Sequence, residues 1–325
     1  MPSLLLVGMF WLTAQAPAAD LAAARELINA GKSVEALARL RSLDASDPHV
    51  ALLLGVAHYH AGDTAKAIEA LTPAVDALPA GSAEQVEGTQ VLGLSLYLAG
   101  RIEPSVPYLE RTRAAAPGNA DLAYVLGMAL VKTGQAAKAR VVWAEAFGVG
   151  ADTAAAHLLT AQMMVRAELD DAAEAELKQA LAKDPRLPHA HFLLGQSALF
   201  RGRLDESVTL LRRELEINPG HALALYRLGD AYARQQKWDD AMGALQRAIW
   251  INPFYSGPYI LLGKGQMQKG NLPAAEAMWR RAIEYDPNNK AAHYLLAQLL
   301  QRTGRTDEAK REFETAEKLI GSADR

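Results

Sequence analysis

Residues 228–253 show most clearly how hydrophobic and polar positions alternate along this chain. The segment reads LGDAYARQQKWDDAMGALQRAIWINP, and its apolar and small residues recur at helical spacing in two stretches. A polar break at residues 235–237 separates them. The second stretch stops at Asn252-Pro253, because proline cannot continue a helix and restricts the residue before it. The pattern predicts one helix, a tight turn and a second, antiparallel helix.

The same pattern recurs at a fixed interval. Prolines stand 34 residues apart at Pro185, Pro219, Pro253 and Pro287, and Pro117 lies two such intervals before Pro185. This period is typical of a repeat array, in which each repeat buries its apolar face against its neighbours. We therefore expect an all-α solenoid of antiparallel helix pairs. Counting in register gives about nine repeats, at residues 17–50, 48–81, 86–119, 120–153, 154–187, 188–221, 222–255, 256–289 and 290–323.

Small residues and one bulky residue mark the helices of most repeats. Leu-Gly pairs occur in the first helix at 54–55, 92–93, 126–127, 194–195, 228–229 and 262–263. Because glycine inside a helix costs about 1 kcal/mol relative to alanine, its repetition indicates that two backbones approach closely there. In the second helix a bulky residue stands between two small ones. These bulky residues are Leu71, Trp143, Leu177, Leu245, Trp279 and Phe313. Such an alternation lets one large side chain fill the gap between two closely packed helices.

These features resemble the tetratricopeptide repeat, a 34-residue helix-turn-helix. Its first helix carries Leu-Gly and tyrosine, and its second carries alanine, a bulky residue, alanine and then proline. The resemblance covers nearly all of residues 20–323. It implies a superhelix in which the first helices line the concave side and usually carry the ligand contacts.

Some repeats depart from the pattern. Four extra residues, around 79–82, separate the second and third repeats and predict either a longer loop or a helix extended by one turn. Glu214 stands at a small position of a second helix, where we expect it to disturb packing unless it reaches solvent or an arginine. His157, His191 and His293 occupy equivalent places in three repeats, where the resembled family often has a large aromatic residue, and we expect packing roles for them.

The resemblance identifies groove-facing positions just after each Leu-Gly pair, three residues further on, and two residues before the leucine. The candidate partner-binding residues are Val56, Tyr59, Leu94, Tyr97, Tyr124, Met128, Gln162, Gln196, Tyr226, Asp230, Lys264 and Gln298. Along the chain they change from apolar and aromatic to amide-rich and charged. Tyrosine supplies contact area at low entropy cost, and glutamine both donates and accepts hydrogen bonds. We therefore expect the groove to bind an apolar segment of a partner at one end and a polar, extended backbone at the other. In the alternative, the apolar members pack between helices and the polar members form a solvated face.

Two ligand-binding patterns of the resembled family are absent from the sequence. A chaperone-tail clamp would pair lysine two residues before the leucine with asparagine after the glycine, and no repeat combines them. The asparagine ladder of the nucleocytoplasmic sugar-transferase array would need asparagine just before the leucine. Those positions hold Leu53, Val91, Val125, Leu159, Leu193, Arg227, Leu261 and Leu295.

Composition narrows the classes of partner. A formal net charge of −3 with mixed signs gives no electrostatic basis for binding nucleic acid or an anionic membrane. No stretch reaches the ~20 apolar residues that a membrane-spanning helix needs. The absence of cysteine excludes disulfides, thiolate metal sites, a cysteine nucleophile and a lipidated N-terminal cysteine.

The sequence offers no convincing catalytic or metal-binding constellation. His58 with His60, and His189 with His191, lie two residues apart, and such residues do not share a helix face. Lys264 stands between two glycines, but the segment lacks the order of a phosphate-binding loop and follows no predicted strand. We therefore expect a protein that is not an enzyme and that uses no cofactor or metal.

Residues 1–20 do not share the repeat pattern. An apolar run over residues 4–12 precedes A-x-A triplets at 14–16 and 16–18, which is the order found in a secretory signal peptide. No Lys or Arg precedes the run. We expect a signal peptide over residues 1–19, cleaved after Ala18 or Ala19, and hence a periplasmic or extracellular protein. In the alternative, the run is an apolar first helix under the array and the protein is cytoplasmic.

The repeats and the leader together predict an exported, non-catalytic scaffold that binds a protein or peptide in its concave groove. The alternative is an adaptor or regulatory subunit of a cell-envelope enzyme or assembly machine, docking through its convex face or its ends. Neither the partner's identity nor the oligomeric state follows from the sequence.

Overall fold

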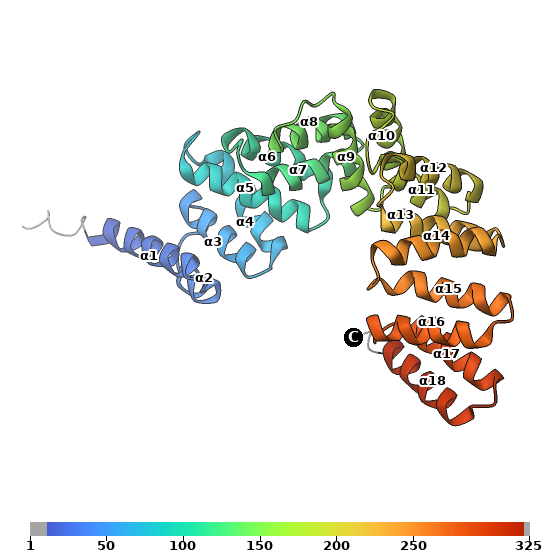
Figure 1. Cartoon of the computed structure of the whole chain (residues 1–325). Helices are drawn as coiled ribbons and strands as arrows, with labels where there is room; N and C mark the ends of the chain where they lie inside the picture. The colour runs from blue at the N-terminus through green and yellow to red at the C-terminus, as the bar shows by residue number, and fades with distance from the viewer. Residues whose placement is uncertain (1–11, 322–325) are drawn as a thin grey trace, which may run out of the picture. The chain divides into compact units, whose positions relative to one another are not determined.

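The computed structural model of the protein describes residues 12–321 (Figure 1). This part of the chain contains 18 α-helices and no β-strand, which confirms the predicted all-α repeat fold. The chain divides into two compact units: an N-terminal unit up to Ala173 and a C-terminal unit from Glu174. Most of the predicted signal peptide, residues 1–11, lies outside the described residues.

The helices follow one another with short connections, alternating between first and second helices of the repeats. The N-terminal unit contains α1 (Leu12–Asn29), α2 (Ser33–Leu40), α3 (Pro48–His60), α4 (Thr64–Ala77), α5 (Ala83–Leu98), α6 (Ile102–Ala115), α7 (Ala120–Lys132), α8 (Ala136–Ala146) and α9 (Ala154–Arg166). The boundary between the units falls within α10 (Asp170–Lys183). The C-terminal unit continues with α11 (Ala190–Phe200), α12 (Leu204–Ile217), α13 (Ala222–Arg234), α14 (Trp238–Ile251), α15 (Ser256–Gln268), α16 (Leu272–Tyr285), α17 (Lys290–Arg302) and α18 (Thr306–Gly321).

Local chemistry accounts for the starts and ends of these helices. The Asn119 side chain caps α7 by accepting a hydrogen bond from the backbone N–H of Leu122 at 3.1 Å. The turn after a first helix needs a left-handed residue, and Gly202 supplies it with φ 74°. One repeat later, Gln236 adopts φ 63° at the same place, which costs about 1 kcal/mol for a residue with a side chain.

The extra residues between the second and third repeats lengthen a helix. Helix α5 has 16 residues, whereas α3 and α7 have 13 each. Ser82 begins the longer helix, since its side chain accepts a hydrogen bond from the Gln85 backbone N–H at 3.1 Å. Of the two predicted outcomes, the structure therefore shows the helix extended by about one turn.

A glycine on the first helix and a bulky residue on the second account for the close packing of each helix pair. Trp279 is 1% exposed and lies so close to α15 that a Cβ atom at Gly263 would stand 2.3 Å from its Nε1. Leu245 covers Gly229 in the same way, with its Cγ 2.6 Å from a Cβ built at the glycine. No side chain fits at either glycine without displacing the core, which explains the repeated Leu-Gly pair.

Glu214 does not disturb its repeat, and the expectation that it needs solvent or an arginine is wrong. Its carboxylate is fully buried on α12 and accepts hydrogen bonds from the backbone N–H groups of His189, at 3.0 Å to both oxygens, and Phe192, at 3.3 Å. These groups begin α11, whose N-cap residue makes no side-chain cap of its own. Ser207, at the other small position, donates to the Gly195 carbonyl at 2.8 Å. Both polar substitutions thus stabilise the backbone of the partner helix.

Ion pairs fix the register between neighbouring repeats of the C-terminal unit. Arg203 donates to Glu174 at 2.9 Å, and Arg305 donates to both oxygens of Glu276 at 2.8 Å, at equivalent places three repeats further on. Hydrogen bonds from Lys178 and then Arg203 lower the pKa of Glu174 to about 2. These contacts join α10 to the start of α12, and α16 to the start of α18.

Candidate partner-binding groove

Some first helices of neighbouring repeats contact each other within each unit. Helix α3 contacts α5 in the N-terminal unit, and α13 contacts α15 in the C-terminal unit. Second helices of neighbouring repeats make fewer such contacts in the described part of the chain. Elements lie closer together on the inside of a curve, so these contacts agree with the resemblance, which predicts a concave face made of first helices. We call this face the groove of each unit.

The twelve candidate residues differ in how much of each side chain the groove exposes. Val56 and Met128 are buried, at 1% and 5% exposed, and contribute mainly to packing. The half-buried members are Tyr59, Leu94, Tyr97, Gln162, Gln196, Tyr226 and Asp230. Tyr124, Lys264 and Gln298 are exposed. Most of the candidates therefore retain surface that a partner could contact, and their role in binding stays a prediction.

In the N-terminal unit the groove brings two tyrosines and a lysine together. The Lys132 Nζ lies 5.6 Å from the ring centroid of Tyr97, a cation–π contact between α7 and α5. Burial, and then the nearby Tyr124, raise the pKa of the Tyr97 hydroxyl. Tyr124 is 42% exposed, so one aromatic ring of this cluster faces solvent.

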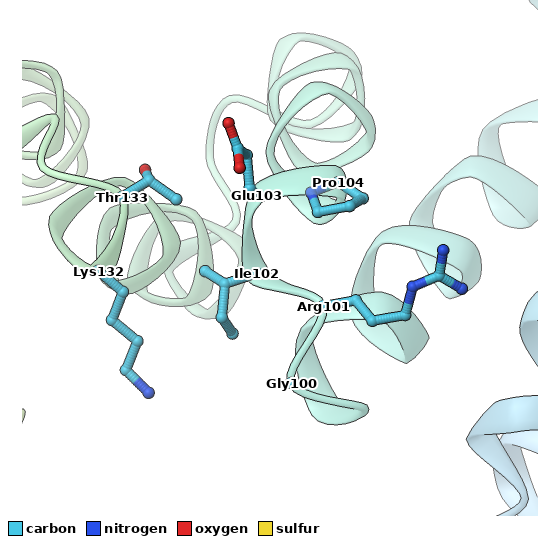
Figure 2. A pocket seen from close by; sticks show the side chains of 7 residues that line it. All are labelled: Gly100, Arg101, Ile102, Glu103, Pro104, Lys132 and Thr133. Atoms are coloured by element: carbon cyan, nitrogen blue, oxygen red, sulfur yellow. The ribbon is translucent and has the colours of Figure 1, made fainter.

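A hollow of about 550 Å³ adjoins this cluster at the turn between α5 and α6. Its lining residues are Gly100, Arg101, Ile102, Glu103, Pro104, Lys132 and Thr133. Figure 2 shows that the ammonium group of Lys132 and the carboxylate of Glu103 point to opposite sides. Lys132 is therefore directed towards Tyr97 and not towards this carboxylate.

In the C-terminal unit the groove contains a second aromatic cluster. The rings of Tyr226 and Tyr255 meet edge to face, with centroids 5.0 Å apart. A Cβ atom at Gly257 would stand 3.1 Å from both rings, so glycine leaves the space that the pair occupies. Burial, followed by the nearby Tyr226, raises the pKa of Tyr255 to about 12, and both hydroxyls stay protonated at neutral pH.

Charged side chains stand beside these rings. The Cζ of Arg227 lies 5.2 Å from the ring centroids of both Phe200 and Tyr226. Asp230 accepts hydrogen bonds from Arg234 at 3.0 and 3.2 Å. Sequence reasoning identified Tyr226 and Asp230 but missed Phe200, Arg227 and Tyr255. The equivalent positions of the other repeats hold leucine or valine, and this exception could have identified Arg227 as a candidate residue.

Two of the three equivalent histidines contact backbone carbonyls. His293 is 7% exposed, and its Nε2 lies 3.0 Å from the Pro287 carbonyl. The Nε2 of His191 lies 3.1 Å from the carbonyl of Pro185, at the equivalent place. His157 is 4% exposed. Within residues 12–321, no three His, Asp or Glu side chains converge into a set that could hold a metal ion. In the same part of the chain, no helix is both long enough and apolar enough to cross a membrane.

Comparison with known proteins agrees with the α-helical repeat architecture and identifies its family. A tetratricopeptide repeat family model matches residues 21–82, 91–147, 124–188, 166–222 and 192–256. A second tetratricopeptide repeat model matches residues 266–319. The matched segments cover more than half of the chain, and the chain belongs to the tetratricopeptide repeat family. This membership supports a protein-interaction scaffold, since repeats of this family generally bind proteins without catalysis.

Several solved structures are similar to parts of the chain. The crystal structure of MamA is 24% identical over 50% of this chain and 96% of that one, with a TM-score of 0.46. A MamA structure from Desulfovibrio magneticus RS-1 is 22% identical over 54% of this chain and 98% of its own, with a TM-score of 0.49. The Cut9–Hcn1 heterotetramer structure of the APC/C is 16% identical over 82% of this chain and 52% of its own, with a TM-score of 0.47. A search of curated proteins found no match.

Proposed function

We propose that the chain is an exported, non-catalytic scaffold that holds a segment of a partner protein in its groove. The main support is the cluster of two aromatic rings and a cation on the first helices α5 and α7: Tyr124 is exposed, and Lys132 lies over the ring of Tyr97. Side chains placed in this way need an explanation, because solvated aromatic rings contribute little to folding. They supply a partner with contact area whose rotamers are already restricted.

The polar side chains of the groove suit the main chain of an extended partner. Gln162 and Gln196 are half-buried, and Gln298 is exposed. An amide side chain donates to a backbone carbonyl and accepts from a backbone N–H at the same time. Within each unit, aromatic anchors and such amides provide the two parts of peptide recognition: buried contact area and main-chain hydrogen bonds.

Quantitative affinity capture from the protein's own cell envelope, with mass spectrometry, tests this function. The baits are the wild-type chain and the double variant Tyr97→Ala/Tyr124→Ala, whose circular dichroism should match the wild type. We expect the partner to be captured by the wild type and its recovery to fall about tenfold or more with the variant, because aromatic anchors dominate binding energy.

The matched control removes two aromatic side chains from a different surface. Trp250, on the second helix α14, is 87% exposed, and Phe254, just after it, is 74% exposed. These residues favour the alternative function, an adaptor that docks through its second helices. If recovery falls only with Trp250→Ala/Phe254→Ala, the groove is not the binding surface and the alternative holds. A partner lost with neither variant contradicts binding through the groove and through this second-helix surface, and no captured partner contradicts both functions.

Export is the second part of the proposal and is supported by the apolar run over residues 4–12 and the A-x-A triplets that follow it. We expect the chain recovered from the cell envelope or the medium to begin at Ala19 or Asp20 when its N-terminus is sequenced. Deletion of residues 4–12 should retain the protein in the cytoplasm. An exported chain that still begins at Met1 would contradict the cleavage, and a chain found only in the cytoplasm would contradict export.

A further inference from the structure

Arg227 on α13 places a charge where other repeats of the C-terminal unit have an apolar side chain. The equivalent residues on α11, α15 and α17 are Leu193, Leu261 and Leu295. The Arg227 guanidinium is held by two rings from different helices, Phe200 at the end of α11 and Tyr226 on α13, each with its centroid 5.2 Å from Cζ. The cation is thus fixed in position by aromatic contacts.

No acidic group neutralises this cation. Within the described residues Arg227 makes no ion pair and no hydrogen bond, and its Nε is buried without a hydrogen-bond partner. Asp230, one turn further along α13, binds Arg234 through both of its oxygens. Leaving a buried donor unsatisfied costs about 1–3 kcal/mol, so packing alone would favour the leucine found in the other repeats.

The geometry leaves the useful part of the guanidinium free. An aromatic ring contacts a guanidinium across its flat face, whereas a carboxylate binds in its plane, through two parallel N–H···O hydrogen bonds at the edge. Nε is the buried nitrogen of Arg227; its two Nη atoms are not buried, and they make no hydrogen bond within the described residues. The two kinds of contact do not compete, and the rings orient the donors in advance, which lowers the entropy cost of binding.

The surrounding charges and surfaces indicate what kind of ligand fits. At the groove-facing positions of α11, α13, α15 and α17, Asp230 is the only carboxylate. Lys264, on α15, is exposed and makes no ion pair among the described residues. Phe200 is 59% exposed beside Arg227. An exposed ring next to an unpaired cation suits a peptide that carries an acidic and an apolar side chain, rather than a small inorganic anion.

We propose that Arg227 binds an aspartate or glutamate side chain of an acidic partner segment, with an adjoining apolar side chain of that segment on Phe200. This inference rests on the proposed function and adds the chemistry of the partner. The groove of the C-terminal unit thus selects its ligand by a charge-assisted hydrogen bond at Arg227, with Lys264 adding attraction at longer range.

Selection from a random-peptide phage library on the full chain tests the proposal without a known partner. We expect peptides selected by the wild type to be enriched in Asp or Glu beside an apolar residue. Arg227→Gln should lose this enrichment, and Arg227→Glu should select Lys or Arg instead. The matched control is Arg247→Gln, which removes the same charge from an exposed place on α14. It should leave the selected sequences unchanged.

The affinity of one selected peptide and of its carboxylate-to-amide twin then measures the contact itself. Replacing the peptide's Glu by Gln should weaken its binding to the wild type about tenfold. The same replacement should weaken binding to Arg227→Gln by less than about twofold. Arg227→Lys, which keeps the charge but not the planar fork, should fall between these values. Thermal unfolding of each variant separates loss of binding from loss of fold.

The outcomes distinguish this inference from the function on which it rests. Peptides selected without acidic enrichment, or equal affinities for the Glu and Gln peptides, would overturn the role of Arg227 and leave groove binding intact. If no peptide is enriched on the wild-type chain, both the groove function and the present inference fail. Enrichment of acidic peptides that survives Arg227→Glu would assign the acidic preference to another surface.

Discussion

Trp279→Ala should lower the free energy of unfolding by about 3–5 kcal/mol, the usual cost of removing a large aromatic side chain from a core. Trp279 is 1% exposed and belongs to the cluster that includes Leu296 and Leu300 of the next repeat. Its Nε1–H also donates to the Ile260 carbonyl at 3.1 Å. The substitution therefore removes packing within one repeat and between two, together with one side-chain hydrogen bond to the backbone of α15.

Urea unfolding followed by far-UV circular dichroism measures this loss. Because each repeat is stabilised mainly by its neighbours, the C-terminal repeats should unfold in an earlier, separate transition. Trp279→Leu should recover much of the stability, since Leu245 covers Gly229 in the same way. The control is Trp250→Ala, which changes the same residue type at an 87% exposed position and should stay within about 0.5 kcal/mol of wild type. Equal losses for the two tryptophans would contradict this account of the core.

This packing could be predicted from the sequence because it depends on residues at fixed spacing. A glycine on one helix and a bulky residue on the next recur with the period of the repeat, and Gly263 with Trp279 follows that rule. The family resemblance also implied that Tyr124 and Lys264 face the groove, and both are exposed. Because the same pattern occurs in many repeats, an ambiguous residue in one repeat does not change the assignment. The fold and the register of its helices therefore follow from one sequence.

The features that could not be predicted from the sequence depend on which side chains meet in three dimensions. The cation–π contacts of Arg227 join α11 to α13, and no local pattern fixes the rotamers that bring Phe200 and Tyr226 to the same guanidinium. Tyr255 lies in a connection between helices, outside the groove-facing positions that the family pattern defines. Spacing alone could not show whether the extra residues at 79–82 form a loop or lengthen α5. Such features are exceptions to the repeat, and the candidate site is built from them.

Glu214 is the exception with the largest expected effect on stability. The repeat pattern marks Glu214 as a misfit, because the pattern alone does not show that the first turn of α11 lies beside this carboxylate. The structure shows a fully buried carboxylate that accepts hydrogen bonds from the backbone N–H groups of His189 and Phe192. A carboxylate in this place satisfies donors that would otherwise be orphaned, and it also interacts favourably with the positive end of the helix dipole.

Glu214→Ala should therefore lower the free energy of unfolding by about 2–4 kcal/mol, even though alanine is the residue that the repeat pattern favours there. The loss combines two buried N–H groups without acceptors and a cavity on α12. Glu214→Gln keeps one acceptor oxygen and should lose roughly half as much. The control, Glu216→Ala, removes an exposed carboxylate that pairs with Arg213 on the same helix and should cost less than about 0.5 kcal/mol. If Glu214→Ala is neutral or stabilising in urea unfolding, the carboxylate does not cap α11, and the small-residue rule holds in this repeat as in the others.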